Sequence, residues 1–305
     1  MKKHCCTPHK IQQHCTSLNS TQTLSQSKLE NVKESAFASR SWCHIPSGDF
    51  TMGNDDVDAI PGDDEGPTHN VTLDAYRIAA TTVTNSEFSA FIRATQYVTE
   101  AERFGSSFVF YLQVSIEERN KHRQFISELP WWLSVPFASW QRPEGSGSHI
   151  HDRPNHPVVH ISWHDAMAYC QWSGTSLPSE EQWERAARGG LNRQRFAWGN
   201  ELTDMNGLPR CNIFRGVFPH SPEQDWQPAP NEADQGAPNG FGLFNVCGNV
   251  WEWCTGALLG GNQPLRGGSY LCHDSYCNRY RVAARNSNTA STSASNIGFR
   301  VISLN

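Results

Sequence analysis

Two cysteines, Cys272 and Cys277, lie five residues apart in the segment RGGSYLCHDSYCNRYR. Five residues of helix turn two side chains about 140° apart, and five residues of strand place them on opposite faces. The two sulfur atoms can therefore meet only if the chain turns between them. Asp274 and Ser275 are residue types that favour a turn, so the sequence predicts a turn that brings the two thiols together.

Three kinds of site use a pair of cysteines: a disulfide, a zinc site and a site for a soft ion. Structural zinc takes four ligands at short spacings, and no second CxxC or HxxxH motif lies near this pair. A disulfide fits the geometry but is rare in reducing compartments. Two thiolates without a third strong ligand suit Cu(I). Cu(I) is the ion that the pattern suggests, and the other two readings stay open.

The composition is that of a compact protein of low charge. The 305 residues include 11 Trp, 23 Gly, 17 Pro and 10 Cys, with 18% charged residues and a net charge of −5. This charge gives no broad attraction for nucleic acid or an anionic membrane. The sequence has no apolar run of about 18 residues and no hydrophobic segment after its N-terminal lysines. We therefore expect a cytoplasmic monomer without nucleic-acid or membrane partners.

The apolar periodicity indicates one α+β domain with little regular secondary structure. Residues 1–38 are rich in Ser, Thr, Gln, Lys and His and lack this periodicity, which predicts a flexible leader. Residues 39–305 then form a single domain. Within it, HNVTLDAYRI (69–78) alternates apolar and polar residues like one half-buried strand.

Three helices carry clear start signals. Thr84, Ser162 and Ser179 are capping residues that precede helical apolar spacing. Gly174 and Gly189 are expected to end the second and the third helix.

Several longer segments resemble one known family. They include FGLFNVCGNVWEW, LPSEEQWERAARGG, RPNHPVVHISWHDAMAYC and the segment that begins GGSYLCHDSYCNRYR. From about Cys43 to its C-terminus, the chain resembles the formylglycine-generating enzymes, also called sulfatase-modifying factors. The resemblance implies one irregular domain with a fold related to C-type lectins. It also implies a copper enzyme that uses O2 to convert a cysteine in a CxPxR-type motif of an unfolded sulfatase to Cα-formylglycine.

The resemblance also assigns residues to an active site. Cys272 and Cys277 match the two cysteines that hold Cu(I) in the family. The other residues that match its active pocket are Ser269, Trp251, Tyr276, His273 and Asn296. Simpler interpretations are core packing for Trp251, a surface imidazole for His273 and packing alone for Tyr276.

Two segments match structural Ca²⁺ sites of the family. The first offers four hard oxygen donors of the kind that Ca²⁺ takes: Asn245, the carbonyls of Gly248 and Val250, and the carboxylate of Glu252. The alternative is that this glutamate pairs with an arginine. The second site would use Asn212, Ile213 and Asp225. Its closing segment is shorter than in the family and lacks a glycine, which leaves the second ion open.

The chain departs from the family in two loops and in its cysteines. The segments 219–230 and 254–265 are shorter than is usual in the family, and the second lies just before the paired cysteines. Secreted animal members carry disulfides that this chain lacks. Cys170 would pair with a position that holds Val301, and the other pair is replaced by Ala187 and Val282. This absence agrees with a reducing cytosol.

The leader contains the segment CTPHK, Cys6 to Lys10, which resembles the CxPxR motif with lysine in place of arginine. One hypothesis is that the leader occupies the peptide groove as a pseudo-substrate. The alternative is a flexible tail with a chance motif.

Two functions of other classes stay open. One is a non-catalytic, lectin-like binding module, against which the retention of the active-site residues argues. The other is an iron-dependent sulfoxide synthase, which would need an HxxxE or HxxHxE cluster on a helix. The sequence offers only His156, His160 and His164, and Pro157 argues against a helix there.

Overall fold

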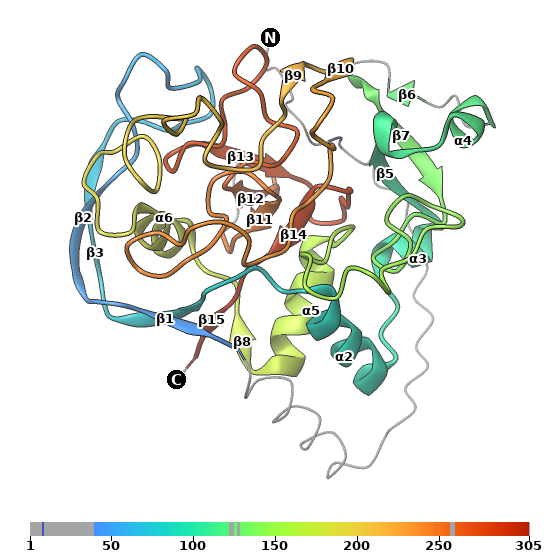
Figure 1. The fold of residues 1–305 in the computed structure, drawn as a ribbon. Coiled ribbons are helices and arrows are strands. Elements are labelled where there is room, and N and C mark those ends of the chain that lie inside the picture. Colours follow the sequence, from blue (N-terminus) through green and yellow to red (C-terminus); the bar gives the residue numbers. More distant parts are fainter. Residues whose placement is uncertain (1–7, 9–39, 122–124, 127–128, 257–259, 305) are drawn as a thin grey trace.

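The computed structural model describes residue 8 and residues 40–121, 125–126, 129–256 and 260–304. Short strands and helices are joined by long irregular segments, as the α+β prediction required (Figure 1). Apart from Pro8, the leader expected over 1–38 lies outside the described residues. The strands form separate small sheets, and large side chains such as Trp132, Trp183 and Trp253 are fully buried between them.

The central sheet has the strand order β13-β12-β11-β14 and lies in the middle of the molecule (Figure 1). Its strands are β11 (Trp251–Trp253), β12 (Gln263–Arg266), β13 (Arg285–Asn288) and β14 (Ile297–Phe299). β11 pairs antiparallel with β12 and parallel with β14. β11 begins at Trp251, β14 begins directly after Asn296, and β12 ends three residues before Ser269. The sheet therefore brings three of the expected site residues to one of its ends.

A second sheet has the order β1-β4-β15-β8, and β2 and β3 form a hairpin beside it. The strands are β1 (Trp42–Ile45), β2 (Gly48–Met52), β3 (His69–Leu73), β4 (Tyr76–Ala79), β8 (Thr175–Ser176) and β15 (Ile302–Ser303). The single strand expected over residues 69–78 is wrong, because β3 pairs with β2 whereas β4 pairs with β1 and β15. Ala75 lies in the break between them and is exposed.

The three expected helices are confirmed as α2 (Asn85–Thr95), α5 (Trp163–Ser173) and α6 (Glu180–Arg188). Thr84, Ser162 and Ser179 each form a reciprocal capping box with the residue three positions later. Gly174 and Gly189 end α5 and α6 in the left-handed conformation. Local hydrogen bonds thus fix these helix ends, which is why sequence patterns could place them.

A third sheet, with the order β5-β7-β6, was not foreseen from the sequence. It contains β5 (Ser106–Phe110), β6 (Phe125–Ile126) and β7 (Leu129–Pro136), and nearby lie α3 (Glu100–Phe104), the 3₁₀ helix η1 (Tyr111–Gln113) and α4 (Ile116–Lys121). Thr99 and Glu102 form a capping box at α3 that the sequence pattern could have revealed. Two further short strands are β9 (Gly216–Val217) and β10 (Ser221–Pro222).

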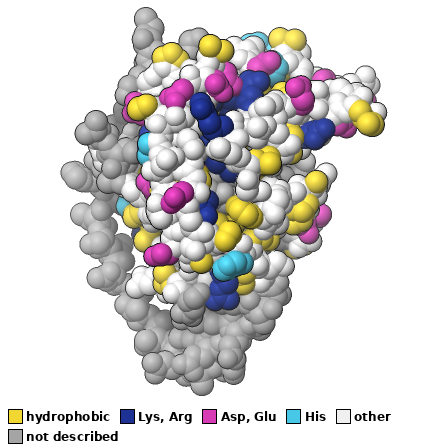
Figure 2. Space-filling model, turned by 90° about the vertical axis from the view of Figure 1, so that its left-hand side faces the viewer, with side chains coloured by type: hydrophobic (Ala, Val, Ile, Leu, Met, Phe, Trp, Pro, Cys, Tyr) yellow, Lys and Arg dark blue, Asp and Glu magenta, His cyan; other side chains and the backbone are white. Residues whose placement is uncertain are grey.

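The surface shown in Figure 2 carries charges of both signs, with Lys and Arg interspersed among Asp and Glu. Among the described residues, no helix is both long enough and apolar enough to cross a membrane.

Candidate active site

The segment that carries the two cysteines folds back on itself in a tight turn. His273 and Cys277 form an antiparallel bridge, and the Cys277 N–H donates to the His273 carbonyl at 2.7 Å. Cys272 is fully buried and Cys277 is nearly so. The two cysteines form no disulfide with each other. The predicted turn between the two cysteines is confirmed.

Backbone hydrogen bonds fix Cys272 against Ser269. The Cys272 N–H donates to the Ser269 carbonyl at 2.9 Å, and the Ser269 N–H donates to the sulfur of Cys272 at 3.4 Å. Gly268 permits this approach, since its φ is +73° and a Cβ there would lie 2.8 Å from the carbonyl oxygen of Arg279. An N–H directed at a sulfur stabilises negative charge on it, which a thiolate ligand requires.

Asn296 and Trp251 complete the inner wall of the site. The Asn296 side-chain amide donates to Ser269 Oγ at 2.9 Å, and the Asn296 carbonyl accepts the Trp251 N–H at 2.8 Å. Both residues are fully buried. The Trp251 indole N–H has no hydrogen-bond partner among the described residues, so this buried donor is open to a small polar ligand.

Aromatic side chains form the outer wall around Tyr276. Its ring lies edge-on to Trp131 with centroids 5.0 Å apart and stacks on Phe218 at 5.1 Å. The ring centroids of His273 and Phe214 lie 6.2 Å apart, and His273 Nδ1 lies 2.7 Å from Ser275 Oγ. Sequence reasoning missed the three partner rings, which come from β7 and the 214–218 segment and carry no local signal.

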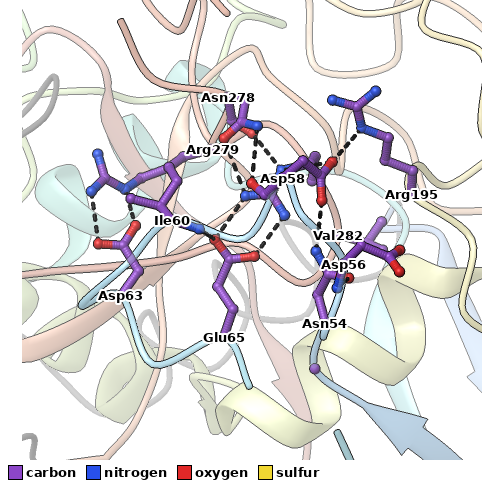
Figure 3. A network of polar contacts seen from close by, with 12 residues as sticks. Asn54, Asp56, Asp58, Ile60, Asp63, Glu65, Arg195, Asn278, Arg279 and Val282 are labelled. Carbon is purple, nitrogen blue, oxygen red and sulfur yellow. Dashed lines mark hydrogen bonds and ion pairs between the residues drawn. The ribbon is translucent and has the colours of Figure 1, made fainter. Parts of the chain in front are cut away.

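Ion pairs hold the chain that follows Cys277 (Figure 3). Arg281 makes a bidentate contact with Glu65 at 2.6 and 2.7 Å, and Arg279 Nη2 lies 2.7 Å from an Asp63 oxygen. The side chains of Arg281 and Glu65 are each 1% exposed. Burial raises the pKa of the Asp63 carboxyl, while its hydrogen bond to Arg279 opposes that rise. We call these four residues the clamp, because they tie the end of the turn to the 54–65 loop.

A cavity of about 580 Å³ opens beside Ser295, the residue before Asn296. Its other lining residues include Gln113, Glu144, Arg153 and Pro228. Ser295 Oγ donates to Gln113 Oε1 at 2.8 Å. This hydrogen bond joins the wall of the cavity to the loop that ends at Asn296.

The donors present at the turn are two thiols. The described residues contain no group of three or more His, Cys, Asp or Glu that could hold a metal ion, so they offer no zinc-type ligand set. Two buried, reduced sulfur atoms fit Cu(I), which takes few, soft ligands.

Residues 28–304 match the family described as the sulfatase-modifying factor enzyme 1-like domain. The chain belongs to this family. A formylglycine-generating enzyme from Thermomonospora curvata is 49% identical over 277 residues, which cover 84% of this chain and 91% of that protein. An inactive C-alpha-formylglycine-generating enzyme 2 from Bos taurus is 42% identical, over 85% of this chain and 86% of that protein.

The fold of this sulfatase-modifying factor family member also matches solved structures. PvdO from Pseudomonas aeruginosa aligns with a TM-score of 0.60 at 20% identity, over 86% of this chain and 93% of that one. At this identity the similarity shows the fold alone. The expected irregular fold of the family is therefore confirmed.

In the first candidate calcium site, the Glu252 carboxylate is paired with an arginine. Both oxygens of the buried Glu252 carboxylate accept hydrogen bonds, from Arg300 at 2.9 and 3.0 Å and from the Trp183 indole at 2.7 Å. Asn245 donates its side-chain amide to the carbonyls of residues 232 and 233. The glutamate–arginine pairing that the sequence left open is thus present, and it neutralises the carboxylate without an ion.

At the second candidate calcium site, the side chain of Asn212 makes hydrogen bonds of its own. The Asn212 side-chain oxygen accepts from the Trp226 indole at 3.3 Å, and its NH2 group donates to Ala229 and Asn249. Ile213 is buried, and Asp225 is exposed to solvent. Asn212 therefore holds the shortened 219–230 segment directly through its amide.

The remaining described cysteines are free and buried or partly buried. Burial raises the pKa of both Cys170 and Cys247 to about 12, which keeps these thiols neutral and unreactive. Val301, Ala187 and Val282, at the positions where the resemblance expects cysteines, are fully buried apolar residues. Packing has replaced the disulfides at these positions.

The three histidines do not form an iron site. His160 is buried, with Nδ1 2.8 Å from Ser107 Oγ and Nε2 2.8 Å from the Pro143 carbonyl. His164 faces Glu100 at 3.2 Å, whereas His156 lines the cavity. Because both ring nitrogens of His160 are bonded to the fold, the sulfoxide synthase reading has no metal cluster among the described residues.

Proposed function

We propose that this chain converts a cysteine in a CxPxR-type motif of an unfolded sulfatase to Cα-formylglycine, with O2 as the oxidant and Cu(I) held by Cys272 and Cys277. The observation that carries the proposal is the pair of buried, reduced thiols on one turn. Its support from comparison is the relative named formylglycine-generating enzyme that spans most of the chain.

When bound, Cu(I) supplies one-electron redox chemistry and an affinity for a further sulfur ligand. The reaction replaces the thiol and one hydrogen of the side chain with an aldehyde oxygen. With O2 as oxidant it also needs two electrons and two protons from an external thiol reductant, and it releases hydrogen sulfide and water. The protein has to bind the peptide, exclude bulk water and offer donors to oxygen-containing species.

The residues of the site are suited to these tasks. Ser269 and Asn296 form a buried hydrogen-bonded pair next to Cys272, and Trp251 adds an unused indole N–H. Fixed donors in a buried site stabilise developing negative charge without reorganising. Tyr276 and the surrounding rings give an apolar wall against which a peptide can pack.

The rival is a non-catalytic relative with the same fold, and such relatives exist at 42% identity. This chain keeps both thiols, and Ser269 forms hydrogen bonds with Cys272 and with Asn296, an arrangement that a pure binding module would not need. The retained donor set favours the enzyme.

One assay distinguishes an active enzyme from a non-catalytic relative. The full chain is loaded with Cu(I) and incubated with O2, a thiol reductant and a CTPSR peptide, and the peptide mass is followed. We expect loss of sulfur with gain of one oxygen, and the loss of signal in a Cys277→Ser variant. An unchanged peptide in the presence of copper-loaded protein would contradict the proposed function.

Calcium at Asn245, Gly248, Val250 and Glu252 is a separate proposal, supported by the oxygen donors of this segment. If the ion binds there, adding Ca²⁺ to chelator-treated protein raises its melting temperature. If the Arg300 pair alone satisfies Glu252, the melting temperature stays the same. We also propose a cytoplasmic location, which the free thiols support.

A further inference from the structure

The cavity beside Ser295 is lined by residues with polar atoms that the fold leaves without partners. Its volume of about 580 Å³ lies within the range of small-ligand sites, about 300 to 1,000 Å³. Asn85 Oδ1, Glu144 Oε2 and His156 Nδ1 are buried and have no hydrogen-bond partner among the described residues. The first two atoms can only accept, and an unpaired buried acceptor costs free energy. The cavity is therefore suited to a ligand that donates hydrogen bonds.

The contacts of Asn85 leave its amide oxygen as the unused atom. Its NH2 group donates to the Arg153 carbonyl at 2.8 Å, and a carbonyl can only accept. The amide nitrogen must therefore face Arg153, and Oδ1 lies on the other side of the group. Asn85 is 4% exposed, so bulk water does not satisfy this oxygen.

The charged side chains of the cavity leave an excess of negative charge. Arg153 Nη1 lies 2.5 Å from Glu144 Oε1, and Arg153 Nε lies 3.7 Å from an Asp152 oxygen. One guanidinium is thus shared by two carboxylates. Burial lowers the pKa of His156, against the opposing effect of Glu232, so this ring adds no positive charge at neutral pH.

Proline residues form much of the remaining wall. They are Pro143, Pro157, Pro228 and Pro230. Proline has no N–H, so this wall offers apolar surface and carbonyl oxygens but no backbone donor. Leu112 and Val159 add aliphatic surface. An aliphatic chain can pack against such a wall while a charged group at its end contacts the carboxylates.

We propose that this cavity binds an ammonium or guanidinium group carried on an aliphatic chain. Glu144 and Asn85 supply the acceptors, and the proline wall packs against the chain. The cation can belong to a basic residue of a bound polypeptide or to a free polyamine, since both carry the same chemistry. Ser295 lines the cavity and directly precedes Asn296 of the active site, so a polypeptide bound at that site lies beside the cavity.

Two small probes test the proposal with the full chain, without copper and without turnover. They are Nα-acetyl-argininamide and Nα-acetyl-norvalinamide, which has the same three-carbon stem but no guanidinium, and their affinities are measured by NMR titration. We expect the arginine compound to bind at least about tenfold more tightly. Glu144→Gln should weaken its binding about tenfold. Glu201→Gln removes an exposed carboxylate outside the cavity and should leave binding unchanged.

Ala229→Leu is a second variant, and it keeps every charge. Ala229 is half-buried in the cavity wall, so a larger side chain fills part of the cavity. We expect it to weaken binding of the arginine compound about tenfold at an unchanged melting temperature. Equal affinities of the two probes, or unchanged binding of the arginine compound in both variants, would overturn the proposal and indicate a cavity that holds only water.

Peptide probes distinguish the two sources of the cation. Fluorescent STPSR and STPSQ peptides, in which serine replaces the reactive cysteine, are compared by anisotropy on the wild type and on Glu144→Gln. If the basic residue of a peptide occupies the cavity, an assignment that rests on the proposed function, the substitution should remove the preference for arginine. If a free amine occupies it, this preference should stay and the affinity for spermidine should fall instead. Because these probes cannot be oxidised, failure of the binding tests is distinct from failure of peptide conversion, which would contradict the proposed function.

Discussion

At the scale of single residues, the backbone of the turn decides where the two sulfur atoms lie. The Ser269 N–H points at Cys272 Sγ, and the Cys277 N–H closes the bridge to His273. The bond between Cys277 and His273 joins main-chain atoms, so it persists when a thiol is replaced by a hydroxyl, and only the acceptor of the Ser269 N–H changes. Ligand chemistry and fold can therefore be separated at these positions.

We expect Cys272→Ser and Cys277→Ser to lose copper while remaining folded. A hydroxyl is a poor ligand for Cu(I), so the affinity should fall by at least about 100-fold, with a cost in folding stability of about 1 kcal/mol. Competition with a Cu(I) chelator and thermal unfolding measure the two effects. Cys43→Ser, a buried thiol outside the turn, serves as the control and should keep copper. Full copper affinity in either single variant would refute the assignment.

At the scale of elements, the turn depends on a loop that is more than 200 residues away in the sequence. Arg279 and Arg281 reach Asp63 and Glu65 in the clamp (Figure 3). The contact between Arg281 and Glu65 is buried, so removal of one charge leaves the other uncompensated. The clamp thus couples folding stability to the position of Cys277.

Glu65→Gln should lower the free energy of unfolding by about 3 kcal/mol and should also weaken copper binding. Urea unfolding and chelator competition are the measurements. Asp225→Asn removes an exposed carboxylate instead and should change neither quantity. A loss of stability with unchanged copper affinity would show that the clamp supports the fold but does not position Cys277.

The range of the contacts within and between elements explains which structural features the sequence could predict and which it could not. Thr84, Ser162 and Ser179 set helix starts through bonds to residues three positions away, so local patterns sufficed. The break of the 69–78 strand depends on which sheet each half joins, and that pairing is long-range. Likewise, the turn between the cysteines followed from spacing, whereas the rings around Tyr276 come from segments without a shared pattern.

At the scale of the whole molecule, two buried groups give opposite responses to acid. Burial lowers the pKa of His160 to about 4 and raises the pKa of Asp165 to about 6. The folded state therefore binds fewer protons than the unfolded state at His160 between about pH 4 and 6.5. At Asp165 it binds more protons between about pH 4 and 6. The two contributions to the pH dependence of stability largely cancel within that window.

Single substitutions should expose each contribution. The stabilisation of the wild type relative to His160→Gln should be greatest above pH 6.5 and should shrink by about 3 kcal/mol as the pH falls to 4, because protonation favours the unfolded histidine. Relative to Asp165→Asn, the wild type should gain about 3 kcal/mol over the fall from pH 6 to 4, because the buried carboxyl becomes neutral. Urea unfolding at half-unit pH steps measures both differences. Since Tyr97, Glu100 and Ser162 all donate to Asp165, the asparagine variant loses acceptor capacity at every pH. That constant offset leaves the slope as the informative quantity, and parallel curves for the wild type and both variants would contradict the assignment of these two groups.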